Sequence, residues 1–114
     1  MTVREVAIGL GLELLTEGQG LEREITGGYA SDLLSDVIAH SQAGNVWITL
    51  QTHRNIIAVA TLKELAAIVL VSGRTPDADT LLKAREEKAV VLSSRLPAFE
   101  LIGQLYQMGI RGVV

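Results

Sequence analysis

Glycine, hydroxyl and arginine residues that could bind an anion recur in the turns of this 114-residue chain. The turns read TGGYAS at 26–31, QTHRN at 51–55, SGRT at 72–75 and SSR at 93–95, each between an apolar segment and an expected helix. Backbone N–H groups at helix starts, with hydroxyls and an arginine nearby, suit a phosphate or carboxylate group. The predicted ligand-binding residues are Gly27, Gly28, Ser31, Thr52, His53, Ser72, Gly73, Arg74, Ser93 and Ser94.

The same residue types also have a purely structural interpretation. Serine and threonine cap helices, glycine makes turns, and an arginine in a loop is commonly solvated. Gly27-Gly28 is expected first as a turn between a strand at 21–26 and a helix capped by Ser31 or Asp32. A binding site therefore requires the turns to converge at one place in the fold.

The chain lacks the motifs of the common enzyme classes. It has no GxxxxGK[ST] phosphate loop, no GxGxxG after a strand and no GxSxG elbow. Taken singly, His53 could be a base or a ligand at a strand end, but a solvated loop histidine is the favoured interpretation. His40 is expected at a helix end, where its charge would meet the helix dipole. Asp32, Asp36 and His40 recur every four residues and predict a solvated helix face rather than a metal site. We expect no catalytic residues, metal or cofactor; a small enzyme using His53 and Ser94 is the weaker alternative.

The hydrophobic pattern predicts the elements that would carry these turns. Thr2-Val3-Arg4-Glu5 has capping-box spacing and predicts a helix over 3–10, followed by strands at 12–16 and 21–26. Strands at 46–50, 67–71 and 89–92 then alternate with helices at 55–65, 76–88 and 97–108. The strands are continuous aliphatic runs, typical of parallel strands covered on both faces. We predict an α/β fold, a three-layer α/β/α sandwich with a mainly parallel sheet, formed by residues 1–114 as one domain.

Composition excludes several partners. The net charge is −3, without a basic cluster, so we expect no nucleic-acid binding. No apolar run is long enough to span a bilayer and no signal-peptide pattern is present, so we expect a cytoplasmic protein without membrane contact. Hydrophobic residues make up 48% of the chain. The expected helix at 55–65 is apolar nearly all round and predicts either a dimer surface or burial beneath the N-terminal helix.

Taken together, the segments REITGGYASDLLSDV, VWITLQTH, AAIVLVSGRTPD and AVVLSSRLPAFELIGQLY resemble the DRTGG domain family over roughly residues 20–108. The five-residue signature is absent, and Arg23, Thr26, Gly27 and Gly28 approximate it with two residues inserted. Such domains are similar to the N-terminal domain of HPr kinase/phosphorylase. The resemblance implies an α/β fold, dimerisation and a regulatory role without kinase activity.

The sequence therefore predicts a non-catalytic regulatory or ligand-sensing domain. We expect a homodimer that binds a nucleotide or another phosphate-bearing anion at the carboxyl edge of the sheet, where the parallel strands end. The alternative is a dimerisation or protein-docking module that takes no small ligand.

Overall fold

The structure is a computed structural model that describes residues 1–113. Within this range the chain forms five helices and five strands. In chain order they are α1 (Val3–Leu10), β1 (Glu13–Leu14), β2 (Gly27–Ala30), α2 (Leu34–His40), β3 (Asn45–Thr49), α3 (Asn55–Lys63), β4 (Ala67–Leu70), α4 (Ala78–Glu87), β5 (Val91–Ser93) and α5 (Ala98–Gln107).

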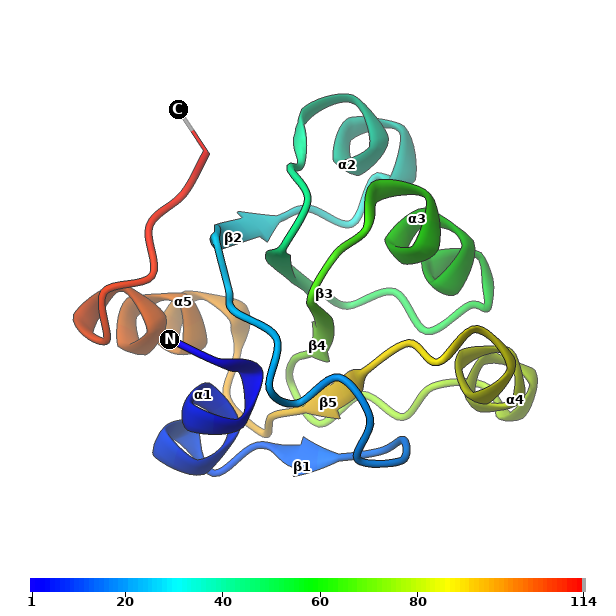
Figure 1. The fold of residues 1–114 in the computed structure, drawn as a ribbon, viewed down its shortest axis with the longest axis horizontal. Coiled ribbons are helices and arrows are strands. Elements are labelled where there is room, and N and C mark those ends of the chain that lie inside the picture. The colour runs from blue at the N-terminus through cyan, green and yellow to red at the C-terminus, as the bar shows by residue number, and fades with distance from the viewer. Residues whose placement is uncertain (114) are drawn as a thin grey trace.

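The strands form one sheet in the order β1-β5-β4-β3-β2. Strands β2 to β5 are parallel, and β1 pairs antiparallel with β5 at one edge. Helices α2, α3 and α4 cover one face of the sheet, whereas α1 and α5 cover the other (Figure 1). The predicted α/β/α sandwich with a mainly parallel sheet is confirmed.

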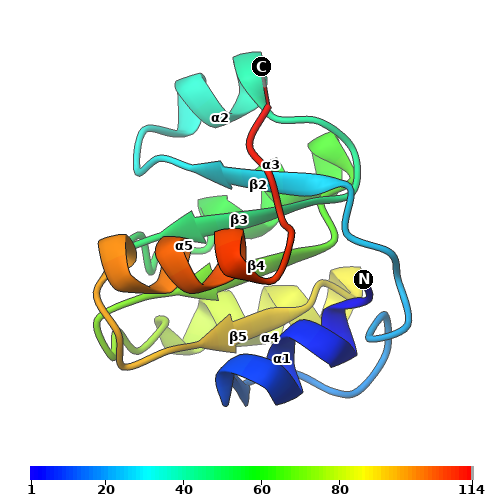
Figure 2. The same cartoon turned by 90° about the vertical axis from the view of Figure 1, so that its left-hand side faces the viewer.

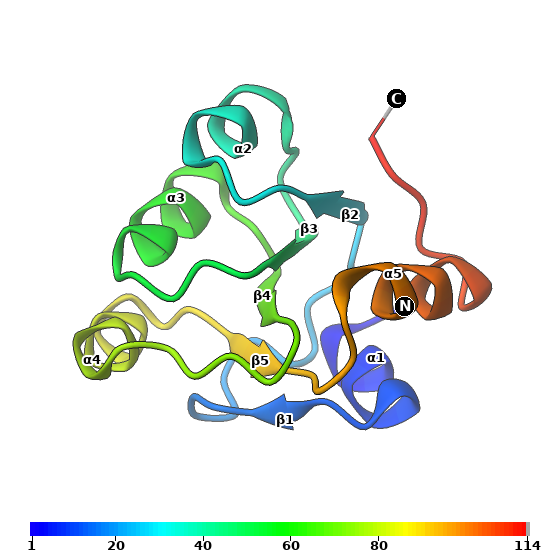
Figure 3. The ribbon, with the colours of Figure 1, turned by 180° about the vertical axis from the view of Figure 1, so that it is seen from behind.

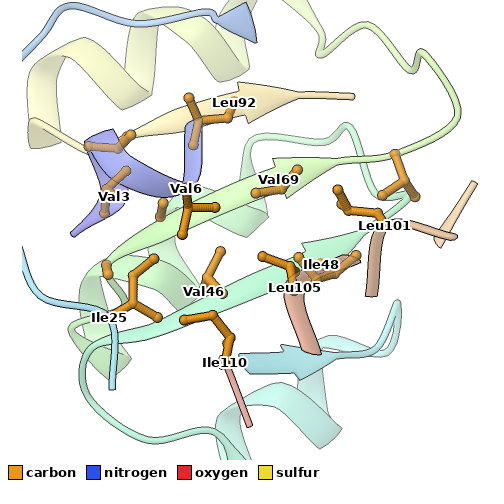
Figure 4. Close-up of a cluster of buried hydrophobic side chains, with 14 residues drawn as sticks. Val3, Val6, Ile25, Val46, Ile48, Val69, Leu92, Leu101, Leu105 and Ile110 are labelled. Atoms are coloured by element: carbon orange, nitrogen blue, oxygen red, sulfur yellow. The ribbon is translucent and has the colours of Figure 1, made fainter. Parts of the chain in front are cut away.

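Two hydrophobic cores lie on the two faces of the sheet. In the first core, side chains of the central strands meet α1 and α5 (Figure 4). Its labelled members are Val3, Val6, Ile25, Val46, Ile48, Val69, Leu92, Leu101, Leu105 and Ile110. The second core joins the opposite face to α2, α3 and α4 around the buried Trp47. Alternate strand residues enter opposite cores because successive side chains point to opposite faces.

The helix limits follow local capping chemistry in part. Helix α1 has the predicted capping box between Thr2 and Glu5 and ends at Gly11 in the left-handed conformation, with φ 62°. The helix predicted from Pro76 begins later, at Ala78, and Pro97 is the residue before α5 rather than its first helical residue. Proline fits both sites because it fixes an extended or early-helical φ.

The predicted strand at 21–26 is wrong. Apart from a single bridge between Thr2 and Glu24, this segment runs as turns and coil across the sheet end, and β2 begins only at Gly27. The backbone of this segment instead bonds to the N-terminus: the Val3 N–H donates to the Arg23 carbonyl at 3.0 Å, and the Ile25 N–H donates to the Met1 carbonyl at 2.8 Å. The Arg23 guanidinium also donates to the Glu64 carbonyl at 2.6 Å and to the Leu65 carbonyl at 3.3 Å. The segment is therefore held against the N-terminus and the end of α3 instead of pairing with a strand.

The predicted dimer surface on α3 is also wrong. Ile57 is 0% exposed and Val59 is nearly as buried, inside the core shared with α2 and α4. Helix α3 lies between α2 and α4, on the face opposite the N-terminal helix (Figure 3). Its apolar character therefore arises from neighbours on three sides, and the alternative burial beneath α1 is wrong as well.

Candidate functional site

The carboxyl edge carries the loops that follow β2, β3, β4 and β5. The loops after β4 and β5 are joined directly by backbone hydrogen bonds. The Ser72 N–H donates to the Leu96 carbonyl at 2.8 Å, and the Gly73 N–H donates to the Ser94 carbonyl at 2.9 Å. These bonds hold the SGRT and SSR turns side by side.

The two turns line a cavity of about 270 Å³, which we call the arginine notch. Its lining residues are Glu13, Leu15, Gly73, Arg74, Thr75, Pro76, Ser93, Ser94 and Arg95. The notch brings together Gly73, Arg74, Ser93 and Ser94 of the predicted site. Arg74 and Arg95 are exposed and oppose one acidic residue, Glu13, so the formal charge of the lining is positive.

Tight local geometry holds the walls of the notch. Ser94 is buried, and its hydroxyl accepts a hydrogen bond from the Leu96 N–H at 3.1 Å. Ser72 and Gly73 both have positive φ, 58° and 66°, and a side chain at position 73 would meet nothing within 4 Å. Ser72 is itself exposed and does not line the notch. The backbone of this turn is thus held in a sharp conformation at the rim of the cavity.

Thr52 and His53 lie on the neighbouring loop and do not line the notch. The Thr52 carbonyl accepts the Thr80 hydroxyl at 2.7 Å and the Asp77 N–H at 3.2 Å, which ties this loop to the start of α4. His53 is exposed, and its Nδ1 accepts the Asn55 N–H at 3.1 Å. The structural interpretation of both residues is therefore sufficient, and His53 is not brought together with Ser94 in the notch.

Ser31 lies at the same edge but belongs to a different cavity, of about 190 Å³, beside Asp32, Thr49 and Leu50. The expected cap of the following helix is wrong, because the residue before α2 is Leu33 and no side chain caps it. Asp32 turns instead toward β3, where its Oδ1 accepts the Thr49 hydroxyl at 2.8 Å and the Leu50 N–H at 2.7 Å. The Ser31 hydroxyl accepts the Leu33 N–H at 3.1 Å.

Gly27 and Gly28 lie at the opposite edge, at the amino end of β2, so their predicted place at the carboxyl edge is wrong. The pair faces the C-terminal segment, whose Arg111 carbonyl accepts the Gly28 N–H at 2.8 Å. A side chain at Gly27 would approach that carbonyl oxygen to 2.9 Å. The glycine pair therefore allows the backbone of the C-terminal segment to approach β2 closely. Figure 2 shows this segment crossing in front of β2.

Of the solvated helix face predicted for Asp32, Asp36 and His40, only Asp36 and His40 lie on α2, because Asp32 precedes the helix. Asp36 accepts the Tyr29 hydroxyl at 2.9 Å and lies 3.0 Å from His40 Nδ1. Hydrogen bonds from Ser31 and Tyr29 lower the pKa of Asp36, and burial together with Asp36 raises the pKa of Tyr29. Nowhere in residues 1–113 do three acidic or histidine side chains gather closely enough to hold a metal ion. The hydrogen bond between Asp36 and Tyr29 fastens α2 to β2.

Arg95 and Glu13 line the notch but were not among the predicted ligand-binding residues. Arg95 follows Ser94 in the same turn, but an arginine beside a turn is commonly solvated. Glu13 lies in a predicted strand, yet only its antiparallel register with Ser93 places it at the notch. No helix among the described residues is long and apolar enough to cross a membrane.

No family model and no curated protein matches this chain. Among solved structures, its fold is similar to the CBS and DRTGG domains of the regulatory region of Clostridium perfringens pyrophosphatase, complexed with the activator diadenosine tetraphosphate. The TM-score is 0.75 at 12% sequence identity, over 93% of this chain and 46% of the other. This chain thus spans about half the length of that structure. The likeness shows a shared fold, which agrees with the DRTGG resemblance of the sequence at that level.

Proposed function

We propose that this chain is a non-catalytic regulatory domain that senses a phosphate-bearing anion at the arginine notch. The observation that carries the proposal is that Arg74 and Arg95 both line a cavity formed by the two turns at the ends of β4 and β5. The crevice outside the carboxyl ends of parallel strands is the usual ligand site of an open α/β sheet. Guanidinium groups suit phosphate because they donate several hydrogen bonds in a fixed plane.

The size of the notch indicates which part of a ligand it would hold. At about 270 Å³ it lies below the common range for sites that enclose a whole drug-sized ligand. We propose that the notch holds one or two phosphate groups, with the rest of the ligand on the surface. The similar pyrophosphatase region is complexed with a diadenosine polyphosphate activator, which supports a nucleotide as the first ligand to test.

Thermal unfolding with a panel of diadenosine tetraphosphate, ATP, ADP, AMP, pyrophosphate and phosphate tests the proposal. A ligand at 100 times its Kd stabilises a fold by about 2.7 kcal/mol, which corresponds to a rise in Tm of about 10 °C for a domain of this size. The double variant Arg74→Ala/Arg95→Ala should lose the shift. Arg54→Ala is the matched control, because Arg54 is exposed at the same edge but does not line the notch.

Two results would overturn the ligand proposal: no member of the panel raises the Tm, or the shift survives in the double variant. A shift lost equally in Arg54→Ala would indicate charge attraction to the whole edge rather than binding in the notch.

We also propose that the domain is a homodimer. A dimerisation or protein-docking module without a small ligand is the second candidate function, and one observation favours it. Phe99 is 86% exposed on α5, although a phenylalanine normally lies in the interior. This candidate predicts stable self-association together with no response to the ligand panel.

A further inference from the structure

The outer side of α5 presents aromatic side chains to solvent. Phe99 is 86% exposed and Tyr106 is 51% exposed, and these are two of the four aromatic residues in the chain. With 3.6 residues per helical turn, Phe99, Gly103 and Tyr106 fall within about 60° of one another around the helix. We call these three residues the α5 stripe. Helix α5 lies in front of the sheet, on the face that it covers together with α1 (Figure 2).

A glycine occupies the centre of the stripe. A side chain added at Gly103 would meet nothing within 4 Å, so no contact inside the domain requires the residue to be small. Glycine in the middle of a helix is unfavourable relative to alanine, which makes its presence here unexplained within a single copy. A missing side chain on an exposed helix face allows a second helix to approach closely.

Opposite charges lie at the two ends of the stripe. Glu100 is exposed next to Phe99. At the other end, the Arg111 guanidinium lies 4.4 Å from the centre of the Tyr106 ring, and its Nη1 donates to the Tyr106 carbonyl at 2.6 Å. Neither Glu100 nor Arg111 forms an ion pair with another of the described residues. The stripe is thus acidic at its start and basic at its end.

We propose that α5 packs antiparallel against α5 of a second copy, about a two-fold axis at Gly103. In this arrangement a residue before Gly103 faces the residue equally far after it in the partner. Glu100 then faces Tyr106 with its attached Arg111, and Phe99 packs against the Tyr106 ring. Each contact occurs twice, so both charges of every copy find an opposite charge and both aromatic ends are covered.

This pattern favours a second copy of the chain as the partner. Two α5 stripes that run in opposite directions place the acidic start of one beside the basic end of the other. The α5 surface rests on the proposed function only in that both require a homodimer; it does not depend on the proposed ligand. The arginine notch lies at the carboxyl edge and shares no residue with the stripe. Ligand binding and association are therefore tested separately on the same samples.

Sedimentation velocity over a concentration series tests the interface. The wild-type chain should dimerise reversibly, and Gly103→Arg should remain monomeric where the wild type is dimeric. The variant fold should be unchanged, because the added side chain points into open space; the fluorescence of the buried Trp47 checks this. Leu62→Arg is the matched control, since Leu62 is 66% exposed on α3 and should leave the dimer intact.

A charge exchange tests the antiparallel register. Glu100→Arg and Arg111→Glu should each raise the dimer Kd about tenfold, since each removes two exposed ion pairs. The combined variant should recover most of the lost affinity. A wild-type chain that stays monomeric overturns both the dimer and this surface. A dimer that persists in Gly103→Arg, or single variants without effect, overturns the surface alone, and failure of the combined variant to recover overturns the antiparallel arrangement.

Discussion

At the scale of single residues, Gly27 and Asp32 both have structural roles that differ from the predicted ones. Gly27 leaves room for the Arg111 carbonyl, which lies more than eighty positions later in the chain. Asp32 holds the end of β3 through the Thr49 hydroxyl and the Leu50 N–H, instead of capping α2. Both roles are contacts between segments that are distant in sequence.

Gly27→Ala should destabilise the fold by about 1–3 kcal/mol, the usual cost of overpacking. The new Cβ would lie 2.9 Å from the Arg111 carbonyl oxygen, and backbone at that position can yield only if the C-terminal segment leaves the edge of β2. Urea unfolding measures the change. Gly28→Ala is the control and should cost less, because its nearest neighbour is an Ile110 methyl group at 3.4 Å. Equal losses in the two variants would contradict the proposed role of Gly27.

Asp36 should make stability depend on pH in the acid range. Its pKa is lower in the folded chain than in the unfolded chain, because Ser31 and Tyr29 donate hydrogen bonds to the carboxylate. The stabilisation is therefore present above the ordinary pKa of about 4 and is lost as pH falls through the folded pKa. Asp36→Asn should be less stable than wild type at pH 7, and the difference should shrink below about pH 4. A difference that is constant with pH would contradict this role.

At the scale of the elements, helix α3 shows how burial can be mistaken for an interface. Apolar residues all round a helix indicate burial, but sequence does not say against what. Here α2, α4 and the sheet cover the helix, and only Leu62 among its large apolar residues remains well exposed. Because α3 is covered in this way, we propose α5 rather than α3 as the surface through which two copies of the chain associate.

Ile57→Ala should destabilise the fold by about 2–5 kcal/mol, because it leaves a cavity in a core position that is 0% exposed. Leu62→Ala, on the same helix but 66% exposed, should change stability by less than about 0.5 kcal/mol. The free energy of unfolding of both variants should be measured by chemical denaturation at the same low protein concentration. An Ile57→Ala chain of nearly wild-type stability would show that α3 is not part of the core.

The alternation of strands and helices was predictable from residue 45 onward. Aliphatic runs such as AAIVLV mark strands covered on both faces, and the observed β3, β4 and α3 begin within one residue of their predicted positions. The segment at 21–26 was predicted as a strand because Leu21, Arg23 and Ile25 alternate with polar residues. In the structure the backbone of this segment bonds to residues 1–4, and the Arg23 side chain bonds to the end of α3.

At the scale of the whole molecule, the sheet is shared by both cores. Val46 and Ile48 of β3 face the core with α1 and α5, while Trp47 between them faces the core with α2, α3 and α4. Neither core can lose its strands without exposing the other. We therefore propose that residues 1–113 behave as one structural unit, in which both cores depend on the same strands.

We expect the chain to unfold in a single cooperative transition. Trp47, the only tryptophan, reports on one core by fluorescence, while far-UV circular dichroism reports on all helices. The two urea curves should coincide, as they do for two-state domains. Leu101→Ala lies in the core opposite Trp47 and should shift both curves equally. Separate transitions for the two probes would show that the layers unfold independently.

The sequence alone determined the layered α/β architecture, the parallel strands and the absence of common catalytic motifs. These features depend on periodicity and spacing within short segments, and both can be read directly from the sequence. Only the tertiary structure decided that Gly27-Gly28 receives the C-terminal segment, that Glu13 and Arg95 join Arg74 at one notch, and that Phe99 rather than Ile57 faces solvent. Each of these depends on which distant segments pack together, and that is set by the competition of all contacts in the folded chain.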